Sequence, residues 1–123
     1  MTKVAVTTDG PTLDHKVDPR FGRCAGFAIV NTETMELTYV DNGGSQAMAQ
    51  GAGIQAAENV ANAGGTVLMS GYVGPKAFDA LTAAGIQIIQ DVDGMTVGEA
   101  IEKFKNGDIK VAEGANTTGG GPK

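Results

Sequence analysis

The chain has 123 residues, with 9 basic and 14 acidic side chains and a formal net charge of −5. This length is enough for one domain with a buried core, and the acidic balance disfavours nucleic acid as a partner, because a phosphate backbone is bound through many basic contacts. No apolar run is long enough to cross a bilayer, no secretory signal opens the sequence, and one cysteine cannot form an internal disulfide, so we expect a cytoplasmic protein without membrane contact.

The first third of the chain predicts three strands and one long loop. Residues 3–8 form a short β-branched apolar run that ends in a turn at Asp9. Residues 9–25 follow as a loop, and a loop of this length inside a compact domain is more often functional than not. Residues 27–30 and 37–40 predict two further strands, which a short turn joins as a hairpin.

The rest of the sequence alternates between helices and strands. We predict a helix over residues 51–63, a strand over 66–69, a helix from Pro75 to Gly85, a strand over 86–89 and a helix from the cap residue Thr96 to Gly107. The apolar residues at helical spacing are Ile54, Ala57, Val60 and Ala61 in the first helix, Ala77, Phe78, Leu81 and Ala84 in the second, and Val97, Ala100, Ile101 and Phe104 in the third. The order β-β-β-α-β-α-β-α predicts one α/β domain over residues 1–107, with a mixed sheet because of the early hairpin. Residues 108–123 are predicted to form a flexible Gly-rich tail.

The long loop holds an unusual set of side chains. Both arginines of the chain, Arg20 and Arg23, fall within residues 15–24, together with its only histidine and its only cysteine. Guanidinium groups gathered against an acidic overall charge indicate an anion-binding feature. The alternative is that the arginines stiffen the loop by pairing with its own carboxylates, Asp9, Asp14 and Asp18.

Two glycine-bounded helix starts are expected beside this loop. If the first strand pairs with the second on one side and lies parallel to the fourth on the other, the chain changes direction there and leaves a crevice at the carboxyl ends of the strands. Helix starts present unpaired N–H groups and a positive dipole end, and glycine lets a guest approach the backbone. The segments expected to meet there are the loop with Arg20, Phe21, Gly22 and Arg23, the start Gly51-Ala52-Gly53, and the segment Gly71-Tyr72-Val73-Gly74-Pro75-Lys76. We therefore predict an anion pocket, although both glycine segments are also ordinary turn and cap sequences.

Other candidate ligands have structural explanations as well. Cys24 is either a small buried hydrophobic residue or a thiolate ligand for Cu(I). We expect His15 to be solvated, and Met48 and Met69 to pack in the core. A nuclease-like or phosphate-handling enzyme would need carboxylates for magnesium, and the candidates are the turn residues Asp9, Asp18, Asp41 and Asp91. The sequence has no Cys-x-x-Cys motif, no paired histidines and no nucleophile elbow that would indicate catalysis.

Several motifs resemble those of one family. The segments Val17-Asp18-Pro19-Arg20-Phe21-Gly22-Arg23, Gly51-Ala52-Gly53, Gly71-Tyr72-Val73-Gly74-Pro75-Lys76-Ala77 and Ala84-Gly85-Ile86 are similar to those of the dinitrogenase iron-molybdenum cofactor biosynthesis family, over about residues 1–107. Within that family the chain most resembles the orange proteins of sulfate-reducing bacteria. The resemblance implies a ribonuclease H-like fold, with a five-stranded mixed sheet flanked by helices. It also implies a non-catalytic carrier or storage protein for a non-covalently held molybdenum-copper sulfide cluster.

Such a cluster is a polarizable anion whose sulfides accept hydrogen bonds, which suits arginines and helix starts. The residues expected to hold the cluster are Arg20, Phe21, Gly22, Arg23, Gly51, Ala52, Gly53, Gly71, Tyr72, Val73, Gly74 and Lys76. Relatives commonly carry a small apolar residue where this chain has Cys24, whose thiolate would suit Cu(I) as an optional ligand. We expect a monomer. A further alternative is an adaptor module for a partner, such as the P-loop ATPases with which orange proteins are associated.

Overall fold

The computed structural model describes residues 2–43, 51–109, 111 and 112. Its strands are β1 (Lys3–Thr8), β2 (Gly26–Asn31), β3 (Leu37–Asp41), β4 (Val67–Met69) and β5 (Gln87–Ile89), and its helices are α2 (Ala52–Asn62), α3 (Pro75–Ala83) and α4 (Val97–Lys105). Each element lies where the sequence pattern predicts it, and the ends differ by a residue or two.

The five strands form one mixed sheet in the order β3-β2-β1-β4-β5. β2 pairs antiparallel with both β1 and β3, whereas β1 pairs parallel with β4 and β4 pairs parallel with β5. The β2–β3 turn is fastened by Asn31, whose Oδ1 accepts the N–H groups of Glu33 and Thr34. The expectation of a mixed sheet with an early hairpin is therefore confirmed.

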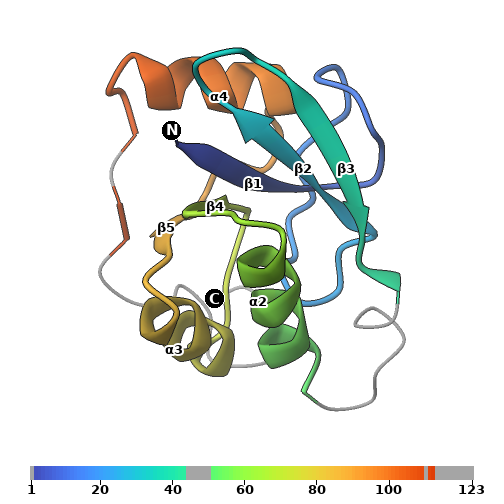
Figure 1. Ribbon diagram of the computed structural model, residues 1–123, viewed down its shortest axis with the longest axis vertical. Coiled ribbons are helices and arrows are strands. Elements are labelled where there is room, and N and C mark those ends of the chain that lie inside the picture. The colour runs from blue at the N-terminus through green and yellow to red at the C-terminus, as the bar shows by residue number, and fades with distance from the viewer. Residues whose placement is uncertain (1, 44–50, 110, 113–123) are drawn as a thin grey trace.

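Helices cover both faces of the sheet. Figure 1 shows α2 and α3 on one face and α4 on the other. Because side chains alternate along a strand, Ala5 of β1 lies in the core that α2 and α3 complete, while Val4 and Val6 lie in the core that α4 completes. All three residues have no exposed surface, which explains why β1 is apolar at consecutive positions.

The buried stripe of α2 differs from the predicted one. Its buried residues are Ala52, Ala56, Ala57 and Val60, whereas Ala61 is exposed and Ile54 is 43% exposed. At 3.6 residues per turn, Ile54 and Ala61 lie roughly 100–120° round the helix from Val60, beyond the side that meets the sheet and α3. In α3 the predicted inward residue Ala84 is exposed, because it is the C-cap residue of the helix.

The chain stays against the sheet after α4. Ile109 packs on the core under α4, and the N–H of Ala112 donates to the carbonyl of Ile88 in β5 at 2.6 Å. These residues are thus held to the body of the protein, although they belong to the predicted tail, and residues 113–123 lie outside the described part. Within the part of the chain that the structure describes, none of the helices has the length and apolar character needed to cross a membrane.

Candidate functional site

The first half of the long loop is a structural support for α4. The carbonyls of Leu13 and His15 accept the N–H groups of Gly98 and Val97, at 2.9 and 2.8 Å, and so satisfy two donors of the first helical turn. The His15 ring lies 2.8 Å from the hydroxyl of Thr12, measured from Nδ1 to Oγ1. His15 is half-buried rather than fully solvated, and it is held at the end of the molecule near α4.

The second half of the loop runs beside the segment that follows β4. The N–H of Tyr72 donates to the carbonyl of Pro19 at 2.8 Å, and the N–H of Phe21 donates to the carbonyl of Tyr72 at 3.3 Å. Together these bonds make a short parallel bridge between Arg20 and Tyr72. The predicted meeting of these two segments is therefore present.

Glycines allow the start of α2 to pack beside the bridge between the loop and the segment after β4. A Cβ on Gly22 would lie 3.0 Å from the Cα of Gly53, and a Cβ on Gly53 would lie 2.8 Å from the Cβ of Ala77 in α3. A Cβ on Gly71 would lie 2.5 Å from the Cα of Pro19. We expected these glycines to open the backbone to a guest, but at these three positions the space is filled by the protein itself. Their role is to bring the three segments together.

Two helix starts are thus directed at one region. α2 begins at Gly51, whose φ of 76° lies in the left-handed region, and α3 begins after Gly74 with Pro75 in its first turn. Neither helix has a side-chain cap or an acidic residue in its first turn. Since the N-terminal end of a helix carries a partial positive charge, both starts favour an anion there, without a carboxylate of their own to neutralise the field.

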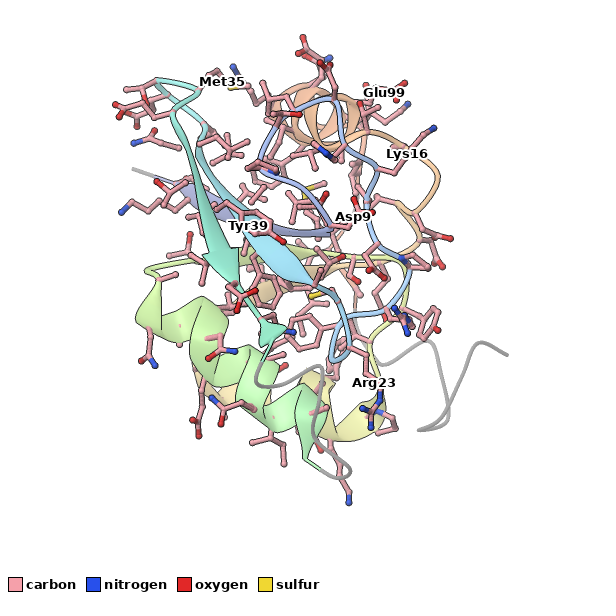
Figure 2. The ribbon with its side chains drawn as sticks, turned by 90° about the vertical axis from the view of Figure 1, so that its right-hand side faces the viewer. Asp9, Lys16, Arg23, Met35, Tyr39 and Glu99 are labelled. Carbon is pink, nitrogen blue, oxygen red and sulfur yellow. The ribbon has the colours of Figure 1, made fainter. Side chains whose placement is uncertain are left out.

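Three predicted cationic residues are exposed around these starts, namely Arg20, Arg23 and Lys76. Figure 2 shows Arg23 at the end of the molecule where α2 and α3 lie, far from Glu99 of α4. Arg20 is paired with Asp18: its Nε lies 3.6 Å from Oδ1, and its N–H donates to the same oxygen at 2.8 Å. The loop-stiffening alternative therefore applies to Arg20, whose side chain nevertheless remains 48% exposed.

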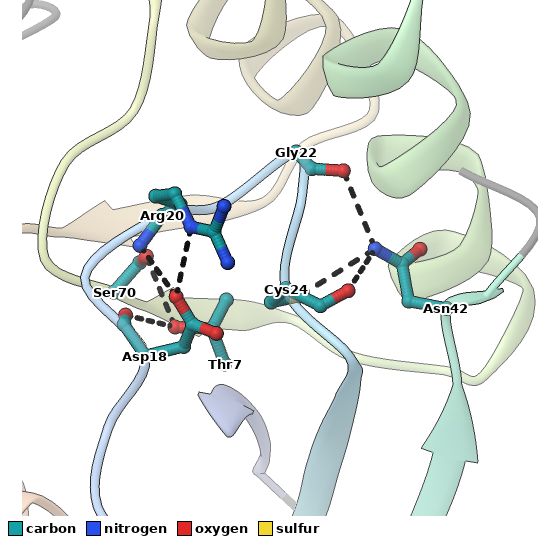
Figure 3. A network of polar contacts seen from close by, with 7 residues as sticks. All are labelled: Thr7, Asp18, Arg20, Gly22, Cys24, Asn42 and Ser70. Carbon is teal, nitrogen blue, oxygen red and sulfur yellow. Dashed lines mark hydrogen bonds and ion pairs between the residues drawn. The ribbon is translucent and has the colours of Figure 1, made fainter. Parts of the chain in front are cut away.

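A buried hydroxyl group, that of Thr7, holds the backbone of Asp18 and is itself in contact with the Ser70 hydroxyl (Figure 3). The Thr7 hydroxyl, at the end of β1, donates to the Asp18 carbonyl at 2.8 Å and lies 3.0 Å from the hydroxyl of Ser70, which follows β4. Thr7 and Ser70 have no exposed surface. The sequence analysis missed both residues, and the available signal was a hydroxyl residue at or just after the carboxyl end of a buried strand.

Several predicted site residues form the floor beneath this surface. Phe21 and Val73 are at most 1% exposed, Ala52 is 6% exposed and Gly71 is also buried. The ring centroid of Phe21 lies 5.8 Å from that of Phe27, which ties the loop to the core. These residues support the site rather than line it, whereas Gly22, Gly51, Gly53, Tyr72 and Gly74 keep exposed surface.

Cys24 is unsuited to ligate a metal in this conformation. It has no exposed surface, and burial, together with the charge of Asp18, raises the pKa of its thiol far above the ordinary value. A metal ligand must be the thiolate, and the surroundings of Cys24 disfavour that form. The interpretation of Cys24 as a small buried hydrophobic residue fits better.

Other metal-binding expectations find little support. Among the residues that the structure describes, no three His, Cys, Asp or Glu side chains are grouped so that they could hold a metal ion. Met69 has no exposed surface and packs in the core under α4, as expected, and Met48 lies outside the described residues. What the structure does bring together in this region are three exposed cations and two helix starts without a side-chain cap.

Comparison with known proteins shows where the chain belongs. The sequence model of the family described as dinitrogenase iron-molybdenum cofactor matches residues 2–107. The chain belongs to this family. Among curated proteins, an uncharacterised protein of Methanocaldococcus jannaschii is 28% identical over 116 residues, which is 92% of this chain and 93% of the relative.

Two solved structures of relatives share the fold. The apo form of the orange protein from Desulfovibrio gigas is 54% identical, with a TM-score of 0.93, over 95% of this chain and 98% of that chain. A Thermotoga protein described as a candidate NifB protein is 33% identical, with a TM-score of 0.76, over 90% of this chain and 93% of that chain. This kinship supports a role in binding or carrying a metal cluster.

Proposed function

We propose that this protein binds and carries an anionic molybdenum-copper sulfide cluster, without catalysing a reaction. The cluster would lie where the second half of the long loop meets the starts of α2 and α3. The observation that carries the proposal is the 54% identity with an orange protein over nearly the whole chain. The site geometry supports it, because two uncapped helix starts and three exposed cations surround one region.

The donors at this region suit the chemistry of a thiometallate. Its sulfides accept hydrogen bonds, and helix-start N–H groups and guanidinium groups donate them. Arg20, Arg23 and Lys76 would supply the charge, and the exposed backbone of Gly51 would allow close contact. Inorganic sulfide would supply the metal ligands, so a Cys24 thiolate is not required.

The remaining assignments are part of the same proposal. The strand order, with β2 antiparallel to its neighbours, supports a ribonuclease H-like classification. We place the protein in the cytoplasm as a monomeric carrier, because a reducing compartment preserves both a free thiol and a sulfide cargo. A P-loop ATPase is the partner class that we propose for loading or release.

Reconstitution tests the function. The purified protein is mixed with tetrathiomolybdate and Cu(I), separated from small molecules by gel filtration, and measured for absorption, molybdenum and copper. We expect a coloured protein with both metals bound. A protein that stays colourless and free of metal contradicts the proposal.

Charge variants test the location. Arg20→Ala and Arg23→Ala should weaken uptake and leave the thermal midpoint nearly unchanged, because both side chains are exposed. Lys103→Ala is the matched control, since it removes one exposed cation from α4, on the opposite face of the sheet. Equal effects of all three variants would show a general response to net charge rather than a local site.

A further inference from the structure

A buried amide lies between the site loop and α2. Asn42 directly follows β3 and is 1% exposed. Its Nδ2 donates to the carbonyl of Cys24 at 3.0 Å and lies 3.4 Å from the carbonyl of Gly22 and 3.5 Å from the Cys24 sulfur (Figure 3). These two carbonyls stand on either side of Arg23 in the sequence, so one side chain fastens both flanks of that arginine.

The other end of the same amide is oriented by α2. The Oδ1 of Asn42 accepts from the Nδ2 of Asn59 at 2.7 Å, and the Oδ1 of Asn59 accepts from the Nε2 of Gln55 at 3.2 Å. The N–H of Asn42 also donates to the carbonyl of Ala25 at 2.8 Å. A continuous row of amides therefore runs from the side of α2 to the loop.

This row fixes the orientation of the Asn42 side chain. Carbonyl oxygens can only accept, so the nitrogen must face Gly22 and Cys24 and the oxygen must face Asn59. On the other flank of the loop, Gly22 packs directly on Gly53 in the first turn of α2. The loop around Arg23 is consequently held against α2 at two points, an apolar one near the helix start at Gly53 and a polar one in its last turn at Asn59.

We propose that Asn42 is a positioning residue of the cluster site, which fastens the Arg23 segment to α2 and so fixes its place relative to the helix start, without touching the cargo. The role rests on the proposed function of the site. Its physical basis is that a buried carbonyl deprived of its donor is costly. Without Asn42, the Gly22 and Cys24 carbonyls turn towards water, and Arg23 leaves the position in which it and the helix start act on the same anion.

The test compares cluster affinity in Asn42 variants, with tetrathiomolybdate and Cu(I) as the probe. Asn42→Ala removes the donor, and Asn42→Asp replaces it by an oxygen that repels both carbonyls. We expect affinity to fall about tenfold in Asn42→Ala and further in Asn42→Asp. Affinity should fall less in Asn59→Ala, which removes only the support of Asn42. This variant keeps the proposal testable if an Asn42 variant does not fold.

A double-mutant cycle separates positioning from stability. In an Arg23→Ala background, the Asn42→Ala substitution should change affinity less than twofold, because its effect passes through Arg23. Ile101→Val, in the core under α4, is the control that lowers the thermal midpoint without changing affinity. Additive effects of Asn42→Ala and Arg23→Ala, or an equal loss of affinity in Ile101→Val, would overturn the positioning role.

The outcomes also distinguish this inference from the proposed function. If the wild-type protein takes up the cluster and the Asn42 and Asn59 variants take it up equally well, the positioning role alone is overturned. No uptake by the wild-type protein overturns the proposed function and the positioning role with it.

Discussion

Asp18 offers a way to raise the positive field of the site by changing one atom. Its Oδ1 accepts the N–H of Arg20 at 2.8 Å and lies 3.6 Å from Nε of the same residue. An asparagine has an oxygen at that place too, so Asp18→Asn keeps the turn and removes the charge. We expect it to bind the cluster more tightly than the wild-type protein, because Arg20 no longer shares its charge with a carboxylate.

The magnitude follows from the exposure of the pair. The Arg20 side chain is 48% exposed, so solvent screens its pairing with the Asp18 carboxylate, which is 13% exposed, and the ion pair contributes about 1 kcal/mol to stability. Between a carboxylate and one negative charge of a cluster at about 6 Å, the repulsion in water is about 0.7 kcal/mol. Removing it strengthens binding roughly threefold for each cluster charge.

Competition between the wild-type protein and Asp18→Asn for tetrathiomolybdate and Cu(I), at low and at high salt, measures this difference in affinity. Asp18→Asn should bind at least about threefold more tightly at low salt, which is the gain for one cluster charge, and should lose most of that gain at high salt. Glu102→Gln is the matched control, because it changes the net charge equally but lies exposed on α4. Weaker binding by Asp18→Asn, or the same gain in Glu102→Gln, would refute the reasoning.

Three further predictions concern stability and packing. Burial raises the pKa of the Cys24 thiol, so above about pH 9 the unfolded chain loses a proton that the folded protein keeps. The unfolding free energy of the wild-type protein, measured by urea titration at pH 8–10.5, should therefore fall with pH by up to about 1.4 kcal/mol per pH unit more than that of Cys24→Ala. Equal slopes of unfolding free energy against pH in the two proteins would contradict this. Thr96→Ala should cost about 1 kcal/mol of unfolding free energy in urea and leave cluster affinity unchanged, because it removes the capping box of α4, in which Thr96 Oγ1 accepts from the Glu99 N–H at 3.1 Å. Hydrogen bonds with Thr96 lower the pKa of Glu99, so the part of the cap that the Glu99 carboxylate makes is lost as the pH falls through that lowered pKa, whereas the Thr96 hydroxyl part remains. Gly53→Ala should weaken cluster uptake because its Cβ would lie 2.8 Å from that of Ala77, and Ala77→Gly in the same chain should restore uptake; uptake that is unaffected by Gly53→Ala would contradict the packing role.

The parts of the site predicted from the sequence are those that strand geometry determines. The carboxyl ends of parallel strands share one sheet edge, so assigning β1 and β4 as neighbours was enough to bring Arg20 beside Tyr72. The exposed cations and helix starts followed from the same placement. The strands themselves follow from turns and apolar runs, whereas the pairing of β1 with β4 was a condition that the structure meets.

The polar supports could not be predicted in this way. Thr7 and Ser70 are 63 residues apart, and Asn42 looks like an ordinary turn residue until its partners on α2 and the loop are known. The same limit applies to Gly22 and Gly53, where the sequence indicates room but not what fills it. Long-range contacts decide these roles, and a single sequence does not specify them.

The location of the cluster is the central claim, and nitrogen-15 NMR during titration with tetrathiomolybdate and Cu(I) tests it most directly. The account predicts that the largest shifts occur at residues 20–23 and in the first turns of α2 and α3, with none in α4. Shifts centred on α4, or no shifts when both metals are present in excess, would contradict it.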